Sequence, residues 1–189
     1  MDGIQIRTES TPDELTIKTE LAKVKRGWFR RTTTEGQVSY TLHVPAGARI
    51  DKASSVNGNI TIQGIQGDVR ASTVNGSIRC SKLAGATDVN TVNGGIHLDQ
   101  RALPAGDHLK ARTVNGSVEV RLPASAGGSL SASTVNGSIR SDITLSNVTH
   151  RKRNKLEARI GDGGPEILLS TVNGAIRILD SRNEQTAAR

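Results

Sequence analysis

The chain has 189 residues, among them 20 Gly, one Cys and only three aromatic residues, and its 25 Lys plus Arg outnumber 18 Asp plus Glu. The single Cys excludes a disulfide framework, and the scarcity of aromatic residues favours a thin aliphatic core over a compact globule. The formal charge of +7 suggests attraction to polyanions.

Residues 1–47 differ from the rest of the chain. They contain all three aromatic residues and runs of alternating apolar and polar residues, such as Val38 to Val44. Such alternation predicts strands. Because terminal repeats are atypical and cover open edges, we expect irregular β coils that close the N-terminal end of the core.

Residues 48–179 repeat the phrase Ser/Thr-Val-Asn-Gly, followed two residues later by Ile or Val in every copy. Its asparagines are Asn57, Asn75, Asn93, Asn115, Asn136 and Asn173. They lie 18, 18, 22, 21 and 37 residues apart, so the last interval is expected to hold two units. A period of about 20 residues indicates a solenoid. The sequence therefore predicts an all-β fold, a single-stranded parallel β-helix (β-solenoid) with one coil per repeat.

Apolar residues occupy fixed positions relative to each Asn. Positions −1, +3 and +5 share one parity, which predicts a single buried face, so we expect Val114 and Ile139 to be buried. Positions −4 and −6 are apolar with the other parity, which places a corner near position −2 or at Asn-Gly itself. Cys80 belongs to the +5 column and is expected to be a small core side chain.

The six asparagines are expected to lie in register along one edge of the stack. Stacked amides can hydrogen-bond to one another, so a structural Asn ladder is our first interpretation. The alternative is an exposed polar stripe that recognises a ligand.

Two basic clusters are candidates for contact with a polyanion, the alternative being solvated loops. Their residues are Arg30, Arg31, Arg151, Lys152, Arg153 and Lys155. The repeats lack the aromatic side chains on which bases stack, and no nucleic-acid-binding motif is present, which disfavours a nucleic-acid partner.

Catalytic and metal-ligating constellations are not expected. The aspartates occupy different positions of the repeat, and the four histidines lack metal-ligand spacing. We therefore expect a protein that is not an enzyme and needs no cofactor. The chain also contains no apolar run long enough to span a membrane.

Residues 180–189 form a polar tail that is expected to be disordered. It follows a last coil, Val172 to Ile178, without an obvious cap. An uncovered strand edge pairs readily with another chain. We therefore expect self-association through this C-terminal edge.

Three motifs in a fixed order resemble a known family. They are Val44-Pro45-Ala46-Gly47-Ala48-Arg49-Ile50, the serial Thr-Val-Asn-Gly-Ser-Ile units, and Ile160-Gly161-Asp162-Gly163-Gly164-Pro165. Over residues 36–180 the chain is similar to the bacterial adhesin-like β-strand-repeat family, a domain of unknown function. The resemblance implies a β-helical domain that is extracytoplasmic or associated with the cell envelope, without an established enzymatic site.

These observations favour a non-enzymatic structural or interaction module of the bacterial cell envelope, with an unknown envelope polymer or protein as its partner. The alternative is a polymer-forming β-solenoid scaffold resembling bactofilin. A polysaccharide-active β-helix enzyme is the third hypothesis, and the scattered carboxylates argue against it.

Overall fold

The computed structural model describes residues 4–11, 15–21, 40–123, 125–161 and 164–181. The chain divides into two compact units, Met1–His43 and Val44–Arg189. In the first unit, β1 (Ile4–Ser10) and β2 (Leu15–Leu21) pair antiparallel in a sheet of their own. This pair belongs to neither of the two sheets that contain the repeats. Residues 22–39, which belong to the same expected N-terminal cap, lie outside the described residues.

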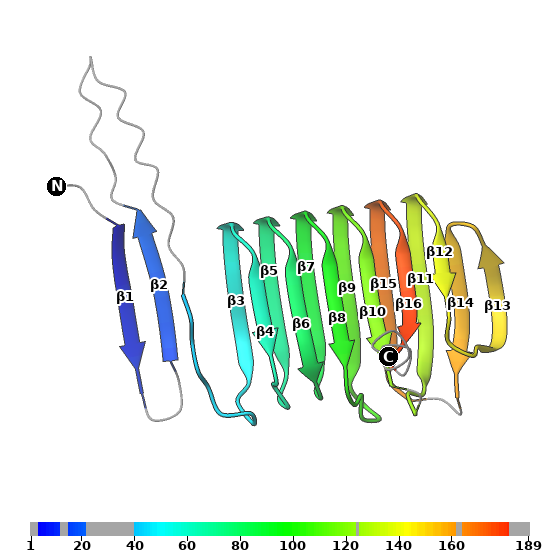
Figure 1. Ribbon diagram of the computed structural model, residues 1–189, viewed down its shortest axis with the longest axis horizontal. Helices are drawn as coiled ribbons and strands as arrows, with labels where there is room; N and C mark the ends of the chain where they lie inside the picture. The colour runs from blue at the N-terminus through cyan, green and yellow to red at the C-terminus, as the bar shows by residue number, and fades with distance from the viewer. Residues whose placement is uncertain (1–3, 12–14, 22–39, 124, 162–163, 182–189) are drawn as a thin grey trace, which may run out of the picture. The chain divides into compact units, whose positions relative to one another are not determined.

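The second unit is built from two sheets whose strands lie side by side (Figure 1). The eight-stranded sheet contains, in spatial order, β13 (Ser146–Lys152), β14 (Lys155–Ile160), β11 (Gly128–Asn136), β15 (Glu166–Asn173), β9 (His108–Asn115), β7 (Thr87–Asn93), β5 (Val69–Asn75) and β3 (Ile50–Asn57). The six-stranded sheet contains β12 (Ile139–Ser141), β16 (Ile176–Asp180), β10 (Val118–Leu122), β8 (Ile96–Gln100), β6 (Ile78–Leu83) and β4 (Ile60–Gln63).

Each repeat is a coil made of one strand from each sheet, joined at Asn-Gly. In β5 the buried side chains alternate up to Thr73, and in β6 they resume at Ile78 and Cys80. The parity therefore changes between positions −1 and +3, which places the corner at Asn-Gly. Because successive coils pair in parallel and in register, equivalent apolar residues form the continuous core between the sheets. The all-β class and the parallel stacking of the repeats are confirmed.

The Val at position −1 is exposed, and the prediction that it is buried was wrong. Val114 is 39% exposed, whereas Val118 at position +3 is fully buried. The two-residue period of a strand cannot be counted across the corner, so −1 and +3 belong to different faces. Ile139 is only partly buried, because β12 is the terminal strand of its sheet.

The coil formed by β15 and β16 is not at the end of the stack. Strand β15 pairs with β9 on one side and with β11 on the other, and β16 lies between β10 and β12 (Figure 1). The prediction that this last coil has a free edge is therefore wrong. The tail beyond Ser181 lies outside the described residues.

Strands β13 and β14 fill the long interval between the fifth and sixth Asn-Gly corners. They pair antiparallel with each other, and β14 pairs antiparallel with β11. The interval thus extends one sheet by two strands and does not supply a second complete coil, contrary to the expectation.

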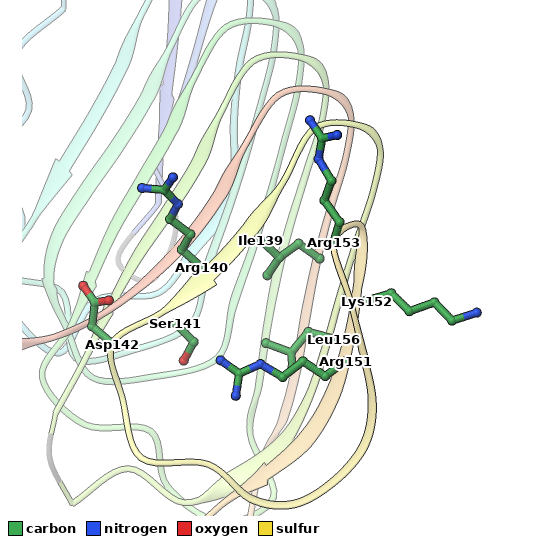
Figure 2. Close-up of a pocket in the computed structure, with 8 residues that line it drawn as sticks. All are labelled: Ile139, Arg140, Ser141, Asp142, Arg151, Lys152, Arg153 and Leu156. Carbon is green, nitrogen blue, oxygen red and sulfur yellow. The ribbon is translucent and has the colours of Figure 1, made fainter.

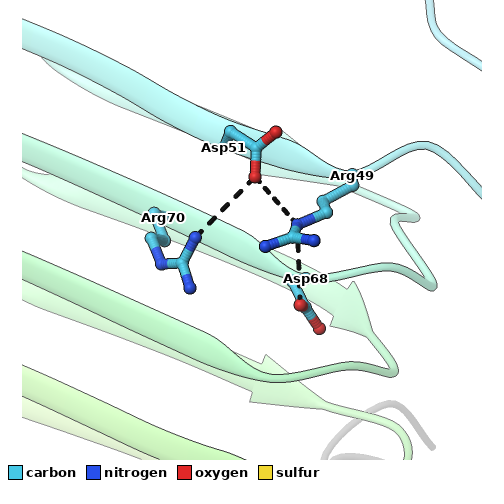
Figure 3. A network of polar contacts seen from close by, with 4 residues as sticks. All are labelled: Arg49, Asp51, Asp68 and Arg70. Atoms are coloured by element: carbon cyan, nitrogen blue, oxygen red, sulfur yellow. Dashed lines mark ion pairs between the residues drawn. The ribbon is translucent and has the colours of Figure 1, made fainter. Parts of the chain in front are cut away.

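The end of the stack that carries β3 has an exposed network of ion pairs (Figure 3). The Nε atom of Arg49 lies 2.8 Å from Oδ1 of Asp51 and 3.6 Å from Oδ2 of Asp68. The Nη1 atom of Arg70 lies 3.7 Å from the same Oδ1 of Asp51. These contacts connect the first coil to the second. Since the side chains are exposed, they add little to stability.

Candidate functional site

A continuous ladder of asparagine amides follows the corners of the coils. At each step an Nδ2 group donates to the Oδ1 atom of the neighbouring amide at 2.8 Å. The members are, in spatial order, Asn57, Asn75, Asn93, Asn115, Asn173 and Asn136. The expected ladder is present, with Asn173 in its interior. An amide has two N–H donors and two acceptor lone pairs, so each interior amide retains hydrogen-bonding capacity beyond the ladder.

Threonine hydroxyls support the corners from inside the stack. The Oγ1 atom of Thr91 donates to the carbonyl oxygen of Gly76 at 2.9 Å, and Thr171 makes the same contact with Gly116. These threonines are buried, with 3 and 4% of their surface exposed. Each hydroxyl therefore satisfies a carbonyl of the adjacent corner and holds the coils in register.

Close stacking explains the glycine that follows the Asn in every coil but the first, where a Cβ atom on Gly58 would meet only the side chain of Ser55. A Cβ atom on Gly94 would overlap the carbonyl oxygen of Gly76, and one on Gly116 would overlap that of Gly94. The obstacle is backbone, which cannot rotate away as a long side chain can. The corner therefore needs Gly for space, and its repeated position fixes where the coils turn.

A row of exposed valines lies next to the ladder. Their exposed fractions range from 37% at Val172 to 65% at Val135. We define the corner stripe as this row and the ladder together: Val56, Val74, Val92, Val114, Val172 and Val135 with Asn57, Asn75, Asn93, Asn115, Asn173 and Asn136. The Thr at position −2 is buried in five of these coils, so the alternation of a strand places the neighbouring Val on the outside. The recurrence of Thr at this position is the signal in the sequence. The stripe offers alternating apolar and amide contacts, repeated at the strand spacing of about 4.8 Å.

A pocket lies at the end of the stack, between β12 and the β13–β14 pair (Figure 2). Its volume is about 460 Å³. The lining residues are Ile139, Arg140, Ser141, Asp142, Arg151, Lys152, Arg153 and Leu156. Four are cationic and one is anionic, so the end pocket has a positive charge. Three of the predicted polyanion contacts, Arg151, Lys152 and Arg153, lie here together with Arg140 of β12.

The remaining predicted basic residues are placed differently. The Nζ atom of Lys155 lies 2.8 Å from an Oε1 atom of Glu157, and this hydrogen bond lowers the pKa of the Glu157 carboxyl. Lys155 is thus already paired and does not line the end pocket. Arg30 and Arg31 lie outside the described residues.

Cys80 is a core residue, as its column predicts. It is 2% exposed, and burial raises the pKa of its thiol from 9.0 to about 12. The thiol is therefore protonated at neutral pH. Across the described part of the chain, no three or more His, Cys, Asp and Glu side chains are grouped as metal ligands. The same residues include no helix with the length and apolar character needed to cross a membrane.

Comparison with known proteins identifies one family. The family model described as Toastrack DUF4097 matches residues 6–179. The match includes strands from both units of the chain. No curated protein and no solved structure matches the chain significantly.

Proposed function

Because the chain belongs to the Toastrack DUF4097 family, whose function is unknown, we propose that it is a non-enzymatic structural or interaction module of the bacterial cell envelope. In this proposal the coils wind as a β-solenoid and hold the corner stripe rigid for a partner. The observation that carries the proposal is the exposure of six valines in register beside a ladder of amides.

The corner stripe suits an elongated partner. Exposed apolar side chains gain free energy when a partner covers them, and the remaining capacity of the amides allows hydrogen bonds with that partner. Because the same pair of side chains recurs from coil to coil, a repetitive polymer can make the same contact several times. We propose an envelope polymer, or an envelope protein with an extended surface, as the partner.

Small polar residues beside the stripe also favour a binding face. At position −3 the outer surface carries Ser72 next to Asn90 and Ser133 next to Ser170, with one larger residue, Arg112, between Asn90 and Ser170. Short side chains of this kind leave the valines accessible and supply further hydrogen-bonding groups. The face is therefore suited to a flat, polar ligand such as a glycan chain.

Sedimentation with purified cell-wall sacculi tests the proposal. The wild-type chain is expected to pellet with the sacculi, while a double variant, Val92→Ser with Val114→Ser, is expected to remain in the supernatant. Thr61→Ala, on the outer face of the other sheet, is the control and should pellet like the wild type. Unchanged melting temperatures show that the variants are folded. Equal pelleting of all three proteins contradicts a role for the stripe.

Fractionation of the bacterium tests the location. We expect an epitope-tagged copy of the full-length gene product in the envelope fraction. Recovery of all of it with the cytosolic markers contradicts the envelope assignment, whatever the result with sacculi.

A further inference from the structure

The two sheets end at different places at the β12 end of the stack. One sheet continues beyond β11 with β14 and β13, whereas the other stops at β12. Strand β12 consequently has a strand neighbour, β16, on one side only. The end pocket occupies the space beside its other edge (Figure 2).

The free edge of β12 has backbone groups directed toward the pocket. The Asp142 N–H donates to the Ile178 carbonyl of β16 at 2.9 Å, whereas the Ile139 N–H donates to the Arg153 carbonyl on the opposite side at 3.0 Å. Backbone groups in a strand alternate between its two edges, so the Ser141 N–H points the same way as that of Ile139. Among the described residues this N–H has no backbone acceptor.

The walls of the pocket combine apolar and cationic side chains. Ile139 is partly buried, and Leu156 is 4% exposed. Arg151 is paired directly with Leu156 in the antiparallel register, so both side chains project from the same face. In Figure 2 the guanidinium of Arg151 extends toward Ser141, while Lys152 points away from the other lining residues.

We propose that the end pocket binds an extended acidic peptide segment of a partner protein, which adds to the six-stranded sheet as a strand beside β12. Its backbone accepts the free Ser141 N–H, its inward apolar side chains lie against Ile139 and Leu156, and its outward carboxylates pair with Arg140, which follows Ile139 in β12 and therefore faces outward. This is strand addition at an exposed sheet edge, in which the backbone provides affinity and the side-chain pockets provide specificity. The site is distinct from the corner stripe.

The chemistry of the pocket favours this occupant over others. A phosphate polymer has no apolar groups for Ile139 and Leu156 and does not need a strand edge. A second copy that offers its exposed β13 brings His150, Arg151 and Lys152 to an already cationic pocket, where like charges repel. An acidic strand pairs with the cationic side chains, covers the apolar wall and accepts the free backbone N–H of Ser141.

Fluorescence anisotropy with a labelled octapeptide of alternating Glu and Val tests the proposal on the full chain. We expect saturable binding that is weakened roughly fivefold or more by Ser141→Pro, which removes one hydrogen bond to the guest strand. Proline is tolerated at edge strands, and here it spares the bonds to β16 because those come from residues 140 and 142. Ser141→Thr keeps the N–H and should bind like the wild type.

Charge and backbone are tested separately. Arg140→Gln is expected to weaken binding roughly fivefold or more, whereas Lys152→Gln, whose side chain points away, should change it less than twofold. Two further peptides carry N-methyl groups on all Glu or on all Val residues. Only one of them should bind, because alternate amides of a strand face its neighbour.

Three results overturn the proposal. The first is equal binding of both methylated peptides. The second is a Ser141→Pro variant that melts like the wild type and binds equally well. The third is inorganic polyphosphate binding as tightly as the peptide with no dependence on Ser141, which identifies a general polyanion surface. If Ser141→Pro does not fold, the methylated peptides and Arg140→Gln decide the outcome.

Discussion

The Nδ2 atom of Asn173 donates a hydrogen bond to the Oδ1 atom of Asn115 at 2.8 Å, although 58 residues separate them in the chain. Asn136, which lies between them in sequence, bonds to the other side of Asn173. The spatial order of the coils therefore differs from their chain order.

Engineered disulfides test this order. On a Cys80→Ala background, Lys110→Cys with Leu168→Cys should oxidise readily, because these residues are register partners on neighbouring strands. Adjacent strands are about 4.8 Å apart, within the range that a disulfide bridges. Lys110→Cys with Ser131→Cys should remain reduced, since β15 lies between their strands. Non-reducing electrophoresis with peptide mapping distinguishes the pairs, and a stack in sequential order gives the reverse result.

A methyl group at a stacked corner should destabilise the protein strongly. Gly94→Ala places a Cβ atom against the carbonyl of Gly76, so we expect a loss of about 3 kcal/mol or more in the free energy of unfolding. Gly47→Ala is the control, because a Cβ atom there meets nothing within 4 Å, and its effect should stay within about 0.5 kcal/mol. Urea denaturation measures both. Similar midpoints for the two variants contradict the close stacking of the corners.

The two valines of one corner should differ in their contribution to stability. Val118→Thr buries a hydroxyl in the apolar core and is expected to reduce the free energy of unfolding by about 1–3 kcal/mol. Val114→Thr leaves a hydroxyl at the surface and should change it by less than about 0.5 kcal/mol. Chemical denaturation of both variants provides the comparison. A loss at Val114 as large as that at Val118 would restore the buried −1 column.

Stability should fall in alkali because of Cys80. The pKa of its thiol is raised by burial from 9.0 to about 12, so the folded protein holds this proton more tightly than the unfolded chain does. The resulting contribution is fully present below pH 9 and is lost as the pH rises toward 12. The measurement is the difference in free energy of unfolding between wild type and Cys80→Ala at pH 7.5 and at pH 10.5. A difference that does not change with pH contradicts the thiol's role.

The features predicted correctly from the sequence depend on one coil and its repetition. The Asn-Gly corner recurs with Ile or Val at +3, so the buried column, the parallel register and the Asn ladder follow from alignment of the copies. Val at −1 was misassigned because its parity was counted through the corner, where the chain passes from one sheet to the other. The burial of Thr at −2 determines the correct assignment.

The spatial order of the coils could not be predicted from the sequence pattern, for a physical reason. Each coil presents the same corner and nearly the same apolar columns, so any coil can stack on any other with similar complementarity. The exception is the β13–β14 pair, which covers one side of β11 and leaves its other side to β15. That choice depends on contacts between distant residues. For the same reason Arg140 and Arg151 were not recognised as walls of one pocket.

The insertion of β15 and β16 also has a consequence for protein synthesis. These strands are made after β11 and β12, yet they separate those strands from β9 and β10. The stack therefore cannot be completed by adding coils in the order in which they leave the ribosome, as is usual when each repeat contacts only its predecessor. Until β16 has been translated, strand edges of four earlier strands lack their final partners. A nascent chain that stalls before this point leaves those edges unpaired, and unpaired strand edges are the groups that template pairing with other chains.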